Sequence, residues 1–445
     1  MAIALALLTR KVVFSLFSGT FLGLLLLNHF DIFLTLEATY ALFVMLISTP
    51  WVLQTLGFVI LIGSIMALIE KSGGIGGFVH FALHQKAFVS SPRSALLLSY
   101  FLGVFIFIET SITALISGAV GKPLCDKYKI PHAKLAYICD STSAPIGSLV
   151  IFNGYGALLL GLITTQITQG SLEGTAFELL LDSVLYNFYA MSALFVAFLF
   201  IWFGVDIGPM KRLEYKRSEI YVEEKVNSMY LMLLPILLML VLIFVFLYIT
   251  GNGEILKGSG SSSIFYTMLS VLGFMLIYYV GTKNMSILEY SKTSFKGAKK
   301  LFAVSMILIF AFSIGEVTSQ LKTGLYLASF ASENLNVIFL AGAIFLLSSL
   351  ISFSTGTSWG TFSIMIPIAV PMALAMDGDT ALIIGAVISG GIFGDHCSPI
   401  SDTTIISSMA AECEVIEHVR TQLPYALISG CIALTLFVVL SFINS

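Results

Sequence analysis

Long apolar runs follow one another along almost the whole chain, separated by short charged or turn-rich segments. A helix needs about 20 apolar residues to cross the hydrocarbon core of a bilayer. We therefore predict an all-α, polytopic membrane protein with about thirteen membrane segments. They lie near residues 12–28, 50–70, 94–108, 109–121, 134–165, 185–206, 229–250, 264–281, 301–321, 335–353, 356–373, 378–411 and 423–443. The run 30–49 can instead lie along the membrane interface, because Asp31 and Glu37 interrupt it.

The composition supports the same class of protein. Hydrophobic residues make up 58% of the chain and charged residues only 11%, against about 25% charged residues in a typical soluble domain. The net charge of −3 gives no reason to expect a nucleic-acid partner. The five cysteines show neither metal-ligand spacing nor a disulfide framework, and the sequence contains no phosphate-binding glycine loop of the Walker type. We expect no resident cofactor and no enzymatic activity.

Lysine and arginine are unevenly distributed among the connectors. Basic connectors of membrane proteins usually face the cytoplasm. The basic residues gather at 10–11, 71–93, 122–134, 211–225 and 283–300, and are absent from 29–49, 166–184 and 373–379. This pattern predicts a protein of the cytoplasmic (inner) membrane with its N-terminus inside and its C-terminus outside. The apolar start of the chain precedes Arg10 and Lys11, the reverse of a secretory signal, so we expect no cleaved leader.

The two halves of the chain resemble each other. The motif Asp140–Pro145 has a counterpart in Asp395–Pro399, and the order of membrane segments around the two motifs is similar. The basic connector 122–134 corresponds to 373–379, which lacks Lys and Arg, so the second copy is predicted to be upside down. Inverted repeats with discontinuous helices at the bilayer midplane are a common transporter plan. The predicted divisions are an N-terminal helix and interfacial segment (1–49), a first inverted repeat (50–206), a connector with two membrane helices (207–300) and a second inverted repeat (301–445).

The segment Gly394–Thr404 places three ionisable side chains, those of Asp395, His396 and Asp402, inside an apolar stretch. A charged side chain at the centre of a bilayer costs roughly 2.5–3.5 kcal/mol on insertion scales. Such residues therefore usually have a function, most often the handling of an ion or a proton. The segment predicts a transporter.

Prolines accompany the acidic residues in both halves. Pro145 and Pro399 each lack a backbone donor and clash with the preceding turn, so the helix is predicted to open there. Carbonyl oxygens freed at such a break, together with carboxylate and hydroxyl oxygens, suit a hard cation such as Na+ better than a transition metal. The predicted cation ligands are the acidic and hydroxyl side chains Asp395, Asp402, Asp140, Glu109, Ser398 and Thr403.

A second break is predicted at Thr355–Thr361, where four hydroxyls and two glycines follow one another in an otherwise apolar region. Its counterpart in the first half is Glu109-Thr110-Ser111. Polar residues beside the breaks are candidates to line the substrate path: Thr357, Ser358, Thr361, Ser143, Asn153 and His396.

Structural roles stay open for each of these residues. Serine and threonine in membrane helices often bond to their own turn or pack between helices, and His396 can be a packed neutral imidazole. The carboxylates can cap helix N-termini, and Glu316 can be a helix-end carboxylate. We expect four further residues on a solvated cytoplasmic face: Glu412, Glu414, Glu417 and His418.

The chain is similar at these motifs to the NhaC-type Na+/H+ antiporter family, within the ion transporter superfamily. The resemblance rests on Gly394–Thr404, Thr357–Thr361 and His418–Ala426, with Asp140-Ser141-Thr142 and Pro145 in the first half. It implies a secondary transporter driven by a sodium or proton gradient, with a broken or re-entrant helix in each inverted repeat. The chain departs from the expected pattern at Ile108-Glu109-Thr110-Ser111, where the resemblance leads us to expect two adjacent acidic residues before an aromatic.

We therefore predict exchange of Na+ or Li+ for H+ by alternating access, in which both ions compete for buried carboxylates. The expected partners of the protein are then these ions and the lipid bilayer, and the sequence leaves open whether the protein forms a homodimer. The alternative is a sodium- or proton-coupled carrier of a small organic acid or amino acid, because a fold does not settle the cargo. A channel is a further alternative, although twofold internal repetition fits a rocking carrier better.

Overall fold

The computed structural model describes residues 11–444 apart from 85–88, 108–109, 152, 216–225, 256–257 and most of 323–335, together with isolated positions before residue 11. Within these residues the regular structure is helical and no strand occurs. Ten of their helical spans are long and apolar enough to cross a membrane, and three shorter apolar helices accompany them. The chain is a multi-pass, all-α membrane protein, as predicted.

Most predicted membrane segments coincide with helices. The first half forms α2 (Val12–Leu27), α3 (Ile32–Ser48), α4 (Pro50–Ser72), α5 (Gly74–His84), α6 (Pro92–Phe105), α7 (Thr110–Tyr128), α8 (His132–Ser141), α9 (Ala144–Leu149), α10 (Gly154–Thr168), α11 (Ala176–Val184) and α12 (Phe188–Phe203). The rest forms the short 3₁₀ helices η1 (Gly208–Arg212) and η3 (Val337–Phe339) with α13 (Tyr230–Thr250), α14 (Gly260–Gly281), α15 (Ile287–Gln320), α17 (Leu340–Thr355), α18 (Ser358–Ala375), α19 (Thr380–Cys397), α20 (Asp402–Ala411) and α21 (Val415–Asn444).

Several helices occupy parts of the chain that were predicted as connectors. α5 and α11 are short helices where we expected connecting segments, and α15 begins within the lysine-rich connector at Ile287. α11 is amphipathic: Phe177 and Leu180 are buried, and the Thr175 side chain caps its first turn. A connector of this kind lacks a long apolar run, so a search for membrane spans overlooks it.

The interruptions predicted from proline and glycine occur in the structure. The segment 134–165 is divided into α8, α9 and α10, and the segment 378–411 into α19 and α20. Between α17 and α18, Gly356 adopts φ +67°, a left-handed conformation that glycine tolerates without steric cost. The next residue, Thr357, begins α18 by accepting the backbone N–H of Gly360 at 3.4 Å.

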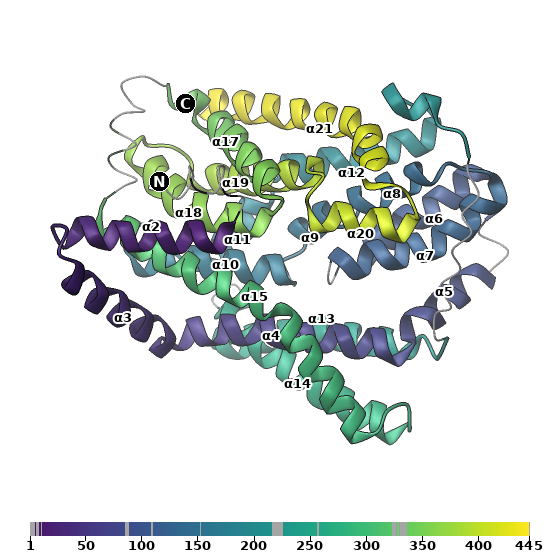
Figure 1. Ribbon diagram of the computed structural model, residues 1–445, viewed down its shortest axis with the longest axis horizontal. Helices are drawn as coiled ribbons and strands as arrows, with labels where there is room; N and C mark the ends of the chain where they lie inside the picture. The colour runs from purple at the N-terminus through teal and green to yellow at the C-terminus, as the bar shows by residue number, and fades with distance from the viewer. Residues whose placement is uncertain are drawn as a thin grey trace.

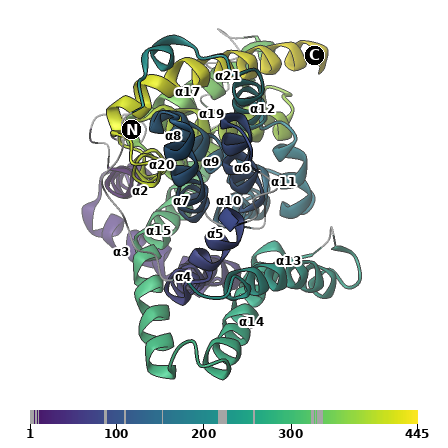
Figure 2. The same cartoon turned by 90° about the vertical axis from the view of Figure 1, so that its right-hand side faces the viewer.

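The helices form two groups that α15 connects. In both views α4, α13 and α14 lie together at one side of the molecule, and α21 lies at the opposite side (Figures 1 and 2). α15 crosses between these groups and packs along α4, α2 and α18. The broken helices α8–α10 and α19–α20 lie in the larger group, surrounded by α6, α7, α12, α17 and α18.

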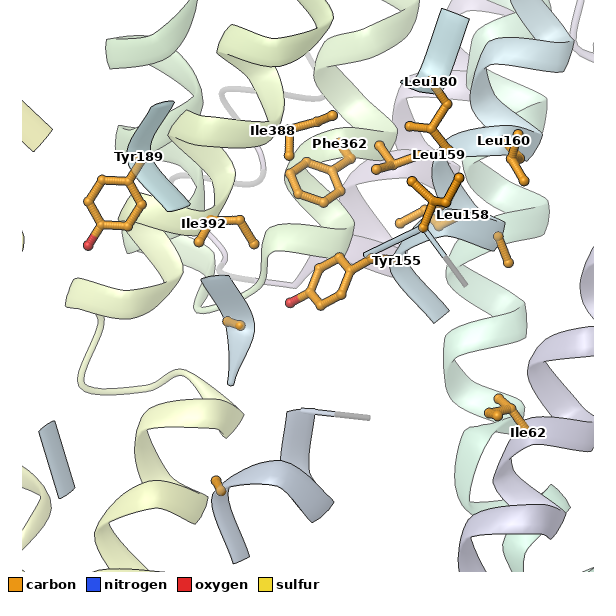
Figure 3. Packing of buried hydrophobic residues seen from close by; sticks show 14 of the residues in the cluster. Ile62, Tyr155, Leu158, Leu159, Leu160, Leu180, Tyr189, Phe362, Ile388 and Ile392 are labelled. Atoms are coloured by element: carbon orange, nitrogen blue, oxygen red, sulfur yellow. The ribbon is translucent and has the colours of Figure 1, made fainter. Parts of the chain in front are cut away.

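α19 is enclosed by protein along most of its length, and two glycines bring it close to α17. A Cβ atom added at Gly390 would lie 2.3 Å from the carbonyl oxygen of Phe345, and one at Gly394 would lie 2.2 Å from that of Ser349. This four-residue glycine spacing is typical of closely packed membrane helices. On the other side of α19, Figure 3 shows the buried side chain of Phe362 from α18 among apolar neighbours.

We expect the substitution Gly390→Ala to destabilise the protein, because the added methyl group meets a backbone carbonyl that cannot move independently. Overpacking of this kind costs about 1–3 kcal/mol. The measurement is the thermal unfolding midpoint of the purified protein in detergent. Gly273→Ala is the matched control, because a Cβ at Gly273 meets open space. Equal midpoints for the two variants would contradict the close packing of α17 and α19.

Candidate functional site

A group of hydroxyls surrounds Asp395, whose side chain is buried near the end of α19. Ser401 donates to Oδ1 at 2.8 Å and Ser358 donates to Oδ2 at 3.1 Å. The Tyr155 hydroxyl lies 2.9 Å from Ser358 Oγ, and the Thr403 hydroxyl lies 2.9 Å from Ser401 Oγ. These five residues, which we call the Asp395 cluster, come from α10, α18, α19, α20 and the break before α20. A carboxylate and four hydroxyls therefore meet where two helices begin and one ends.

Asp140 lies near the end of α8 and is also fully buried. Its Oδ2 accepts hydrogen bonds from Thr404 Oγ1 at 3.2 Å and from Gln422 Nε2 at 2.9 Å, and its Oδ1 accepts one from Ser407 Oγ at 3.4 Å. Thr404 and Ser407 lie three residues apart and so share one face of α20. Asp140 therefore receives donors from α20 and α21, far from it in the chain.

Two buried histidines lie beside Asp140. Its Oδ2 is 3.9 Å from His396 Nε2 and 3.8 Å from His418 Nε2. His396 also contacts Ser141 Oγ at 3.2 Å through Nε2 and the Tyr189 hydroxyl at 2.6 Å through Nδ1. Each buried imidazole nitrogen thus has a polar neighbour, which offsets the cost of removing it from water.

The predicted ligands are divided between several positions. Asp395 and Thr403 share one cluster, while Asp140 belongs to the neighbouring group of polar side chains. Asp402 is exposed at the start of α20, and its Oδ1 accepts the backbone N–H of Thr403 at 2.9 Å. Ser398 donates to the carbonyl oxygen of Phe353 at 2.8 Å, which ties the break to α17. Glu109 lies outside the described residues.

The substrate-path candidates have mainly local bonds. Ser358 and His396 contact the buried carboxylate groups, as described above. Thr361 and Ser143 bond to the backbone of their own turns, at 3.0 Å from the carbonyl oxygens of Thr357 and Asp140. Asn153 caps α10 with its side-chain oxygen and donates to the carbonyl oxygen of Gly147 at 2.7 Å. These bonds satisfy backbone groups near the ends of α18, α8 and α9.

Sequence reasoning missed several residues of the site and was wrong about another. The missed residues include Gln422, Tyr189, Ser401, Tyr155, Thr404 and Ser407. His418 was expected on a solvated face, but its side chain is fully buried and its Nδ1 lies 2.7 Å from Ser408 Oγ. The signal for this was its spacing: His418 and Gln422 are four residues apart, on one face of a helix that continues into an apolar run.

An ion pair joins α20 to α7 at the end of the site. Lys122 Nζ contacts Glu412 Oε1, and both side chains are largely buried. Glu412 adopts φ +53° at the end of α20, and its carbonyl oxygen lies 3.5 Å from His132 Nδ1. Glu412 was also predicted on a solvated face, so this expectation was wrong as well. The contact fixes the end of the helix that carries Thr404 and Ser407.

We expect Lys122→Met and Glu412→Gln each to lower the thermal unfolding midpoint, because each removes the oppositely charged partner of a largely buried charge. The reversed pair Lys122→Glu/Glu412→Lys should recover most of the loss. The midpoints of the two single variants, the reversed double variant and the native chain form the test. A reversed pair that is less stable than both single variants would contradict an electrostatic contact.

Comparison with known proteins shows which family this chain resembles. The model of a family described as the Na+/H+ antiporter family matches residues 153–442. An uncharacterized protein of Haemophilus influenzae is 34% identical over 96% of this chain and 86% of its own length. A shorter match, 39% identical over 21% of this chain and 20% of its own, is to an uncharacterized Na+/H+ antiporter of the same organism. The malate-2H+/Na+-lactate antiporter of Bacillus subtilis is 36% identical over 23% of each chain.

Solved structures share the fold. The YdaH transporter of Alcanivorax borkumensis aligns with a TM-score of 0.62 over 91% of this chain and 88% of its own, at 13% sequence identity. At so low an identity the similarity concerns the arrangement of helices alone.

Proposed function

The chain belongs to the Na+/H+ antiporter family, and we propose that it exchanges Na+ or Li+ for H+ by alternating access, in a cytoplasmic membrane with its N-terminus inside. The fold and the family make it a transporter. The ions exchanged and the mechanism are our proposal. The observation that carries it is the Asp395 cluster, a buried carboxylate whose direct contacts are hydroxyl groups.

The chemistry of this cluster suits a small hard cation. Hard cations bind oxygen ligands, and a hydroxyl can turn its O–H away and offer a lone pair instead. Ser358 and Ser401 can therefore donate to the Asp395 carboxylate when the site is empty and accept the cation when it is filled. A buried carboxylate without a counter-charge is costly, so either a cation or a proton stabilises it. Binding one in place of the other links the two fluxes.

The helix breaks support a change in access. Asp140 and Asp395 are both enclosed by protein, so an ion reaches them only when the surrounding helices move. Interrupted helices provide backbone positions about which such movement can occur. The contact between Lys122 and Glu412 closes the end of the site at α7 and α20, which the distribution of basic residues assigns to the cytoplasm.

A second candidate is a sodium- or proton-coupled carrier of a small organic acid or amino acid. Two observations favour it: the partial match to the malate-2H+/Na+-lactate antiporter, and the hydroxyl-bearing N-terminus of α18 beside Asp395. Backbone N–H groups at a helix N-terminus can bind a carboxylate. This carrier uses the same buried carboxylates for the coupling ion.

We expect everted vesicles that contain the protein to release accumulated protons when Na+ or Li+ is added. The measurement is the fluorescence of a dye that is quenched by an acidic vesicle interior, with vesicles lacking the protein as the control. Recovery of fluorescence on addition of Na+ or Li+ supports cation exchange. A response that requires malate, lactate or an amino acid would refute bare cation exchange and support the second candidate.

We expect Asp395→Asn to abolish exchange, because an amide cannot neutralise a bound cation. The amount of protein in the membrane should stay near normal, since asparagine keeps the size of the side chain. Asp31→Asn is the matched control: Asp31 caps α3 at an exposed position, and asparagine caps a helix equally well. Transport at the native rate by the Asp395 variant would refute the proposed site.

A further inference from the structure

Gln422 makes three polar contacts while fully buried between α8, α19 and α21. Its Nε2 donates to Asp140 Oδ2 at 2.9 Å and to the backbone carbonyl oxygen of His396. Its Oε1 lies 2.8 Å from His418 Nε2. One side chain from α21 thus holds the carboxylate at the end of α8 and a carbonyl group at the end of α19.

The orientation of this amide is determined by its neighbours. A carboxylate oxygen and a backbone carbonyl oxygen are acceptors, so the NH₂ group must face Asp140 and His396. Reversing the amide would place Oε1 against both of these oxygens and leave two buried acceptors without a donor. In this orientation Oε1 faces His418 Nε2, which donates to it in the tautomer that carries a proton on Nε2, and Ser408 lies at the other ring nitrogen. The NH₂ group is therefore fixed on Asp140.

The two buried carboxylates differ in one of the donors that they receive. Asp395 accepts from the hydroxyls of Ser358 and Ser401, and Asp140 accepts from those of Thr404 and Ser407. Each of these hydroxyls can rotate and become an acceptor for a cation. Asp140 also accepts from the amide of Gln422, and an amide NH₂ group is a donor only, whose positive end repels a cation. While Gln422 stays in place, its NH₂ group therefore disfavours a cation at Asp140 Oδ2 and at the carbonyl oxygen of His396.

We propose that Gln422 decides which buried carboxylate binds the transported cation, by keeping it away from Asp140 and so directing it to Asp395. Gln422 acts through Asp140 and is a positioning residue that sets specificity between two otherwise similar sites. This inference rests on the proposed exchange of Na+ for H+ and assigns the cation to one part of the site. It predicts that replacing the hydrogen-bond donor at position 422 by an acceptor creates a second cation-binding position, at Asp140.

The test compares Na+ binding by purified protein in four forms: the native chain, Asp395→Asn, Gln422→Glu, and the double variant Asp395→Asn/Gln422→Glu. Radioactive Na+ is the probe. We expect Asp395→Asn to lose binding and the double variant to recover it within about tenfold of the native affinity, because Asp140 then has a second carboxylate beside it. Gln54→Glu in the Asp395→Asn background is the matched control, since Gln54 accepts a bond from Ser262 on α14, away from both carboxylates.

The outcomes separate the two proposals. A native chain that binds no Na+ overturns the proposed function and the inference with it. A native chain that binds Na+, with a double variant that does not recover binding, overturns the inference alone. Recovery by Gln54→Glu as well would also overturn it, since added negative charge anywhere would then suffice.

A second variant tests the proposal even if Gln422→Glu does not fold. Gln422→Met keeps the length of the side chain and removes its donors, so Asp140 Oδ2 becomes available to a cation. We expect the KM for Na+ to change at least about fivefold, and by a larger factor than the maximal rate does. A uniform loss of rate with an unchanged KM would show that Gln422 only holds the helices together, and would overturn the inference.

Discussion

The structure depends on how it satisfies two carboxylates that are enclosed by protein within a membrane-spanning fold. A buried polar group without a partner costs about 1–3 kcal/mol, and a charge costs more. Asp140 and Asp395 therefore need several donors each, and a single continuous helix cannot supply them because its backbone groups are already paired. The donors come from side chains at helix ends: Ser401 and Thr404 in α20 and its start, Ser358 at the start of α18, and Gln422 on α21.

The interrupted helices follow from this requirement. A helix end exposes carbonyl or N–H groups that need partners, and the same interruptions place hydroxyl-bearing residues next to the acidic ones. Ser398 is an example: its hydroxyl donates to the carbonyl oxygen of Phe353 on α17, while the backbone around it turns toward α20. The glycines at 390 and 394 let α17 lie directly against α19, so the polar centre is surrounded by tightly packed helices and closed to lipid.

The two carboxylates sit in different chemical surroundings. Both accept from hydroxyls, which can either donate or accept, but Asp140 also accepts from an amide that can only donate and has two imidazoles nearby. In the exchange that we propose, the site holds two kinds of ion at different moments. Carboxylates with unlike neighbours suit this task better than two identical ones.

The sequence by itself determined the membrane spans, the helix breaks and the presence of acidic residues in apolar surroundings, because these depend on local composition and on the backbone limits of proline and glycine. It named Asp140, Asp395 and Ser358, whose side chains are buried, and it expected His418 on a solvated face, where the structure buries it. Only the tertiary structure decided which polar side chains meet. Gln422 reaches Asp140 because α21 packs against α8, and Asp402 is exposed because of the way α20 lies on its neighbours. Contacts between helices so far apart in the chain depend on the packing of all of them, which no local pattern records.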